Sequence, residues 1–144
     1  MRVKDEKAMR SFGGRLANVL KAGDVVTLSG PLSAGKTTLV RGLLAALGHG
    51  GEVPSPSFAI VQPYDELNLP VWHVDLFRIE DVGELDELGL EAAGEGVLLV
   101  EWPEKAGVAA WPQALGLTLE FEEGGARRLT AKVPPSWQSR WPPR

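Results

Sequence analysis

Residues 30–37 read Gly30-Pro31-Leu32-Ser33-Ala34-Gly35-Lys36-Thr37, a complete match to the phosphate-binding pattern G-x-x-x-x-G-K-[ST]. In this pattern, backbone N–H groups surround phosphate oxygens, the lysine reaches the β- and γ-phosphates, and the final hydroxyl ligates Mg²⁺. Lys36 and Thr37 hold the last two positions. The stretch therefore predicts a phosphate site at the electropositive start of a helix.

The flanking sequence supports this interpretation. Residues 24–29 form an apolar run typical of a buried parallel strand. Residues 38–47 place apolar side chains on one helical stripe, and Gly48 is suited to end that helix. The alternative is a glycine-rich turn that contains Lys-Thr by chance, and the order of strand, loop and helix argues against it.

Length and composition limit the class of protein. A chain of 144 residues suits one domain with a sizeable core. It contains no cysteine and two histidines, so disulfides are excluded and a zinc site is not expected. The first twenty residues are rich in charge and lack a long apolar run, which predicts no signal peptide, no membrane span and a cytoplasmic location.

Charge is distributed unevenly along the chain. Residues 1–123 hold 10 basic and 19 acidic side chains, whereas residues 124–144 hold five basic and no acidic ones. The acidic body argues against a nucleic-acid-binding face on this chain alone. For the basic end, contact with a polyanion and a simply solvated terminus both stay open, and the solvated terminus is favoured.

The remaining patterns predict an α/β fold of the P-loop NTPase type, with a mixed sheet that is parallel at its centre, flanking helices and a C-terminal antiparallel hairpin. We expect a helix over residues 5–21, weakened in its middle by Gly13 and Gly14, and a short acidic helix over 84–93. Further strands are expected at 58–61, 69–74 and 97–100, with the hairpin at 116–121 and 128–133.

Residues 1–133 are expected to form one ATPase domain. Residues 134–144, rich in Pro and Trp, are expected to be a basic tail that is ordered only if its tryptophans dock.

Two acidic residues follow apolar strands and are candidates for metal and water chemistry. Asp75 follows residues 71–74 and Glu101 follows residues 97–100. The carboxyl ends of parallel strands gather where ligands bind, and phosphate-transfer sites hold Mg²⁺ there with an acid. Glu101 is the stronger candidate because its strand is the more apolar. For each residue the alternative is a surface carboxylate at a strand–loop junction.

Neighbouring residues have two interpretations each. His73 lies two residues before Asp75, so both face the same side of a strand, and His73 either orients Asp75 or packs partly buried. Arg78 lies near the phosphates or pairs with a nearby acid. Trp102 lines the nucleotide pocket or fills the core, with the core as the default. The seven acids between residues 80 and 95 form either a docking face for a basic partner or a solvated surface.

An ordered set of motifs resembles the TsaE (YjeE) family, the small bacterial ATPases of tRNA threonylcarbamoyladenosine biosynthesis. The resemblance covers about residues 5–133. The matching segments are 30–38, Arg41-Gly42-Leu43, Ser55-Pro56-Ser57-Phe58, 73–78, 84–89 and 100–104.

The resemblance implies ATP and Mg²⁺ as cofactors and TsaB- and TsaD-like proteins as partners, with tRNA reached only through their complex. It also implies roles for individual residues. Ser33, Ala34, Gly35, Lys36, Thr37 and Thr38 would bind phosphates; Thr37 and Glu101 would serve Mg²⁺; Asp75 would position water; and residues 55–58 would form a nucleotide-sensing switch.

The chain departs from the family pattern in places. Pro31 stands where an acid is common, Ser57 where threonine is common, and Ser33 where glycine is common, so Ser33 tests whether that position needs a positive φ. The hairpin turn lacks an arginine directly after its first glycine. Arg127 is a candidate substitute that would contact the nucleotide.

Other functions fit less well. A GTPase needs Asn-Lys-x-Asp, and neither Asn18 nor Asn68 lies in that pattern. A small P-loop kinase has an arginine-rich lid, whereas Arg78 is the only arginine between residues 42 and 126. A non-hydrolysing ATP-binding adaptor stays open as an alternative, although binding alone does not need both Asp75 and Glu101.

Overall fold

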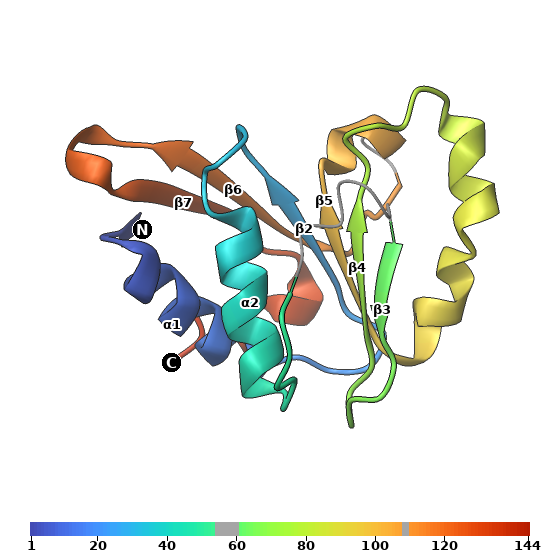
Figure 1. Cartoon of the computed structure of the whole chain (residues 1–144), viewed down its shortest axis with the longest axis horizontal. Helices are drawn as coiled ribbons and strands as arrows, with labels where there is room; N and C mark the ends of the chain where they lie inside the picture. The colour runs from blue at the N-terminus through green and yellow to red at the C-terminus, as the bar shows by residue number, and fades with distance from the viewer. Residues whose placement is uncertain (54–60, 108–109) are drawn as a thin grey trace.

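The computed structural model describes residues 1–53, 61–107 and 110–144. Its centre is a seven-stranded sheet in the order β1-β7-β6-β2-β5-β4-β3 (Figure 1). The strands are β1 (Arg2–Val3), β2 (Val25–Ser29), β3 (Val61–Tyr64), β4 (Val71–Asp75), β5 (Val97–Glu101), β6 (Leu115–Phe121) and β7 (Arg127–Lys132). The four central strands β6, β2, β5 and β4 run parallel, whereas β1, β7 and β3 pair antiparallel with their neighbours. The predicted α/β class, with a mixed sheet parallel at its centre and a C-terminal hairpin, is confirmed.

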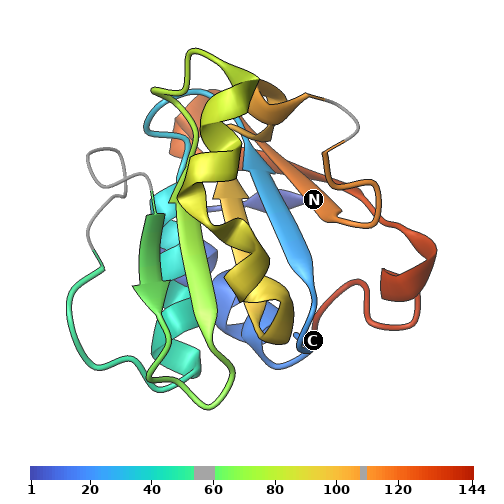
Figure 2. The same cartoon turned by 90° about the vertical axis from the view of Figure 1, so that its right-hand side faces the viewer.

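Helices cover the two faces of the sheet differently. The α-helices α1 (Glu6–Ala17) and α2 (Lys36–Ala46) lie together on one face. The 3₁₀ helices η1 (Val82–Leu88) and η2 (Leu90–Glu95) lie across the other face (Figure 2). Shorter 3₁₀ segments are η3 (Pro103–Ala106), η4 (Glu123–Gly125) and η5 (Pro135–Trp137).

The structure corrects three details of the sequence-based assignment. The predicted helix at 84–93 is two 3₁₀ helices, because Gly89 adopts φ 66° and ends the first of them. The two-residue strand β1 was not predicted, since it is too short to show a period and forms by pairing with β7. Of the strand expected at 58–61, residues 58–60 lie outside the described residues, and the described strand runs from Val61 to Tyr64.

Glycines set the distance between α1 and α2. A Cβ on Gly13 would lie 2.1 Å from the Leu39 carbonyl oxygen, and one on Gly42 would lie 2.0 Å from the Arg10 carbonyl oxygen. The backbones of the two helices therefore touch at both positions. Gly13 lowers the local helix propensity, as the sequence predicted, and in return it permits the packing that fixes α2 behind the phosphate loop.

The C-terminal segment docks on the rest of the chain. The Trp137 side chain is 1% exposed and belongs to the main hydrophobic core. Arg140 pairs with Asp24 at 2.7 Å, so this arginine does not belong to a solvated end. The condition stated for an ordered tail is met at Trp137, while the division at residue 133 stays a prediction.

Candidate functional site

The loop between β2 and α2 depends on left-handed backbone positions. Gly30 and Gly35 have φ values of 137° and 109°, and a Cβ on Gly30 would lie 2.4 Å from the Leu119 carbonyl oxygen. Ser33 also adopts a positive φ, 66°. The position that is often glycine in the resembled family therefore does need this conformation, and serine accepts the strain here.

Lys36 is the first residue of α2 and its side chain is almost buried. The residue is 5% exposed, and its Nζ donates a hydrogen bond to the Gly30 carbonyl oxygen at 2.6 Å. The same Nζ lies 3.8 Å from the centre of the Trp102 ring. Burial lowers the pKa of Lys36, while Glu101, Asp75 and Glu104 act in the opposite direction. The ammonium group is thus held in place by a neutral carbonyl and an aromatic face.

The two candidate acids lie side by side at the end of the central sheet. Asp75 and Glu101 are direct partners in the β4–β5 ladder and are 4% and 3% exposed. Asp75 Oδ1 accepts a hydrogen bond from the Phe77 backbone N–H at 2.8 Å. Thr37 Oγ1 donates to Glu101 Oε2 at 3.5 Å. Neither acid is a surface carboxylate.

These groups line one hollow of about 290 Å³. Its lining residues are Leu32, Ser33, Gly35, Lys36, Thr37, Thr38, Arg41, Asp75, Glu101 and Trp102. Five of the phosphate-binding candidates and both acids therefore line the same space, whereas Ala34 is fully buried and does not line it. Trp102, for which the core was the default, lines the hollow in a left-handed conformation (φ 60°) and also packs on Phe77.

The oxygen donors fit Mg²⁺ that arrives with a nucleotide. Mg²⁺ prefers hard oxygen ligands and is typically held by one or two carboxylates together with substrate phosphates and water. The Thr37 hydroxyl and the Glu101 carboxylate supply such oxygens. In the described part of the chain, no group of three or more His, Asp or Glu side chains could hold a metal by itself.

His73 on β4 contacts Glu101 on the neighbouring strand β5. Its Nε2 lies 2.6 Å from Glu101 Oε2, and the imidazole is 0% exposed. From the sequence, the shared face of β4 suggested that His73 either orients Asp75 or packs partly buried. The register places His73 opposite Leu99, so Glu101 is its diagonal neighbour. That contact depends on strand pairing, which the local sequence does not reveal.

Arg127 holds the phosphate loop from its other side. Its guanidinium donates to the carbonyl oxygens of Ala34 at 3.2 Å and Ser33 at 3.3 Å, and it lies 4.6 Å from the centre of the Phe121 ring. It also lines a smaller hollow of about 190 Å³ together with Met9. Contact of Arg127 with the nucleotide stays a prediction.

The structure tests two further predictions only in part: the nucleotide-sensing switch and the acidic docking face. The Ser55–Phe58 segment lies outside the described residues. In the acidic stretch, Asp81 caps η1 and forms a reciprocal capping box with Glu84. These two acids therefore stabilise local structure, and docking by the stretch stays a prediction.

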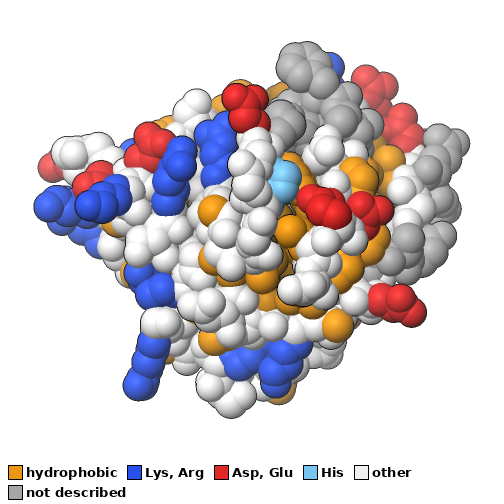
Figure 3. Space-filling model, turned by 60° about the horizontal axis from the view of Figure 1, so that its bottom comes forward, with side chains coloured by type: hydrophobic (Ala, Val, Ile, Leu, Met, Phe, Trp, Pro, Cys, Tyr) orange, Lys and Arg blue, Asp and Glu red, His pale blue; other side chains and the backbone are white. Residues whose placement is uncertain are grey.

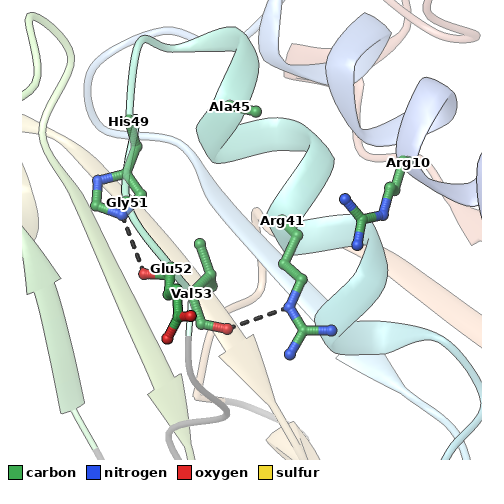
Figure 4. Close-up of a pocket in the computed structure, with 7 residues that line it drawn as sticks. All are labelled: Arg10, Arg41, Ala45, His49, Gly51, Glu52 and Val53. Carbon is green, nitrogen blue, oxygen red and sulfur yellow. Dashed lines mark hydrogen bonds between the residues drawn. The ribbon is translucent and has the colours of Figure 1, made fainter.

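A larger hollow lies elsewhere, beside α2. It measures about 480 Å³ and is lined by Arg10, Arg41, Ala45, His49, Gly51, Glu52 and Val53 (Figure 4). Arg41 Nε donates to the Val53 carbonyl oxygen at 3.1 Å, and Arg10 approaches Glu6 at 3.4 Å. Charges of both signs also mix on the face shown in Figure 3. This hollow lacks the lysine, hydroxyl and paired acids of the phosphate-loop site, so the hollow of about 290 Å³ is the candidate site.

Comparisons with known proteins identify the family of the chain. The family model described as "Threonylcarbamoyl adenosine biosynthesis protein TsaE" matches residues 3–129. Proteins named tRNA threonylcarbamoyladenosine biosynthesis protein TsaE are similar to this chain. That of Streptomyces coelicolor is 46% identical over 67% of this chain and 68% of its own length, and that of Mycobacterium leprae is 40% identical over 84% and 78%.

A solved structure gives the same answer for the fold. The crystal structure of Bacillus subtilis YdiB superposes with a TM-score of 0.80 at 29% identity, over 96% of this chain and 87% of that one. Among the described residues, no helix combines the length and the apolar character needed to cross a membrane. The family model matches residues 3–129, and the relatives and the solved structure agree with it. The chain therefore belongs to the TsaE family of threonylcarbamoyl adenosine biosynthesis proteins.

Proposed function

We propose that the chain is a Mg²⁺-dependent ATPase that acts with TsaB- and TsaD-like partners in the formation of threonylcarbamoyladenosine in tRNA. Family membership supports the pathway. One observation supports the chemistry above all others: the phosphate loop, Lys36, Thr37 and the paired acids Asp75 and Glu101 face one hollow. A site that only bound nucleotide would not need two buried carboxylates at the phosphate end.

Each residue has a role that follows from its position. Backbone N–H groups of residues 33–38 would receive the β-phosphate at the start of α2, where the helix dipole favours an anion. Lys36 would move from the Gly30 carbonyl oxygen to a phosphate oxygen. Thr37 and Glu101 would hold Mg²⁺, which when bound offsets charge that develops on the transferred phosphate.

Asp75 is the candidate for positioning the attacking water. Its carboxylate is fixed by the Phe77 N–H and lies beside Glu101 in the ladder. One oxygen is thereby committed to the backbone, and the carboxylate is held in a defined orientation. In that orientation the carboxylate would position the attacking water.

Partners are expected to set the rate. Two apolar residues at the phosphate-loop site are exposed: Leu32, which lines it, is 61% exposed, and Phe77, which packs on Trp102, is 40% exposed. A water-filled site preorganises charge poorly, so hydrolysis by the chain alone should be slow. Closure by a partner surface would exclude water and raise the rate.

The direct test is phosphate release from ATP with and without Mg²⁺, by this chain alone and with TsaB- and TsaD-like proteins. We expect slow Mg²⁺-dependent release that the partners stimulate. Tight ATP binding without hydrolysis under any of these conditions would favour the adaptor. Transfer of the phosphate to a small molecule would favour the kinase.

A second variant set tests where the partner docks. Reversal of Glu84, Glu87 and Glu91 to lysine should weaken a pull-down of the partners at moderate salt and leave ATP affinity unchanged. The control reverses Asp65, Glu120 and Glu123, which are exposed acids outside the stretch, and gives the same change in net charge. Equal binding by both triple variants would show that residues 80–95 are only a solvated surface.

A further inference from the structure

The contact between His73 and Glu101 has a defined direction. A carboxylate can only accept, so the hydrogen bond of 2.6 Å requires a proton on His73 Nε2. The other ring nitrogen, Nδ1, is buried and has no hydrogen-bond partner within the described part of the chain. A buried N–H without an acceptor costs more than an unpaired lone pair, so Nδ1 carries no proton. The imidazole is therefore the neutral Nε2–H tautomer.

This tautomer gives Glu101 a donor without giving it a counter-charge. Glu101 Oε2 is committed to His73, with Thr37 Oγ1 farther away at 3.5 Å. Glu101 Oε1 makes no hydrogen bond within residues 1–53, 61–107 and 110–144. Because His73 is neutral, the carboxylate keeps its full charge for a cation.

Packing alone does not explain a histidine at this position. Val71, Val74 and Leu99 lie beside it on the two strands and are each 0% exposed. An aliphatic residue would fill this place without an unpaired ring nitrogen. The compensation present in the structure is the short hydrogen bond to Glu101.

We propose that His73 is a positioning residue that fixes the Glu101 carboxylate for the Mg²⁺ of a bound nucleotide. The inference rests on the proposed function. The imidazole touches neither nucleotide nor metal; it restricts the rotation of Glu101, so that one oxygen stays on His73 and the other is presented to the hollow. Its effect should therefore be confined to the Mg²⁺-dependent part of nucleotide binding.

The test uses ADP, which cannot turn over, and measures its affinity by calorimetry with Mg²⁺ and with EDTA. In His73→Leu, the gain in affinity caused by Mg²⁺ should fall about tenfold, as is typical when a partner that orients a metal ligand is lost. Affinity in EDTA should not change. The control is His49→Leu, which alters the other histidine. His49 follows the C-terminal end of α2 and lies 3.4 Å from Glu66, and this variant should match the parent.

Two amides make the test independent of core packing. His73→Gln places a donor near the former Nε2, whereas His73→Asn carries the same amide one methylene short of it. Glutamine should retain the Mg²⁺ effect and asparagine should lose it. Equal Mg²⁺ effects in the asparagine and glutamine variants would overturn the inference, even if the leucine variant did not fold.

The outcomes also separate this inference from the proposed function. A parent protein whose ADP affinity does not respond to Mg²⁺ would overturn the metal site and the inference together. A parent that responds to Mg²⁺, accompanied by a folded His73→Leu that responds equally, would overturn the role of His73 alone.

Discussion

Two cations with little solvent exposure, Arg140 and Lys36, have opposite surroundings in this molecule. Arg140, in the C-terminal segment, pairs with Asp24 at 2.7 and 3.1 Å and donates to the Val19 carbonyl oxygen at 2.9 Å. Lys36, in the phosphate loop, has one neutral carbonyl at 2.6 Å. Each lies 3.8 Å from the centre of a tryptophan ring, Trp137 and Trp102 respectively. Both cations therefore lie against an aromatic ring, but only Arg140 has a carboxylate as a direct hydrogen-bond partner.

The difference distinguishes a charge used for structure from a charge kept for a ligand. The charge of Arg140 is neutralised within the fold, so it contributes to holding the C-terminal segment on the domain. The charge of Lys36 is held but not neutralised by direct pairing, and burial lowers its pKa. A phosphate would supply the missing anion. The family match ends at residue 129, so only Lys36 lies inside it.

The largest expected effect comes from removing Lys36, the cation that would bind the ligand. Lys36→Ala should reduce ATP affinity about thousandfold, or about 4 kcal/mol, because no other side chain in the motif supplies a positive charge to the β- and γ-phosphates. Calorimetric titration with ATP and Mg²⁺ measures this. Unchanged affinity would refute the phosphate site.

Removing the structural cation should destabilise the fold instead. Arg140→Met leaves Asp24 charged, nearly buried and without its ion-pair partner, which should lower the free energy of unfolding by about 2–3 kcal/mol. Urea denaturation measures the loss, and nucleotide affinity at low temperature should be unchanged. The double variant with Asp24→Asn should recover part of the stability. A loss below about 0.5 kcal/mol would mean that the pair behaves as a surface ion pair.

The carboxylates beside Lys36 should affect turnover more than metal-free binding. Glu101→Ala should lower the hydrolysis rate by at least about tenfold, or about 1.4 kcal/mol of transition-state stabilisation, and should leave nucleotide affinity in EDTA unchanged, because the loop and Lys36 still bind phosphate. Asp75→Ala is the companion variant, measured in the same phosphate-release assay. If Asp75→Ala is inert while Glu101→Ala is not, Asp75 is structural; if both are inert, the strand-end argument fails.

The smallest effect is a proton balance at Lys36. Because burial lowers the pKa of Lys36 in the free protein and a bound phosphate favours its charged form, ADP binding in the alkaline range should take up a fraction of a proton. Calorimetry at about pH 9 in two buffers of different ionisation enthalpy detects the uptake. Lys36→Arg, which stays charged, should not show it. Equal uptake by parent and variant would assign the proton to another group.

The sequence was most informative where structure is local. The phosphate pattern, its flanking strand and helix, and the alternating hairpin each lie within a short window, and each was predicted with the right element type. Asp75 and Glu101 were predicted as strand-end acids because apolar runs end at them. The boundaries of these elements shifted by one or two residues, whereas the first helix, expected over residues 5–21, runs only from Glu6 to Ala17.

Contacts between distant segments were beyond the reach of the sequence. Gly13 read as a weak point of a helix until α2 was placed against it. Trp137 read as part of a tail until the core included it. Arg127 was predicted as a nucleotide contact, and the structure adds that it donates hydrogen bonds to carbonyl oxygens of the phosphate loop.

By itself, the sequence determined that a loop with the phosphate-binding pattern joins an apolar strand to a helix, because backbone conformation and hydrophobic period act over a few residues. Only the tertiary structure decided which charges are neutralised: Arg140 meets Asp24, Lys36 meets a carbonyl oxygen, and Glu101 meets His73. Those partners are brought together by sheet register and by docking of the chain end. Electrostatic and hydrogen-bond energies depend on distance in space, which the local sequence does not carry.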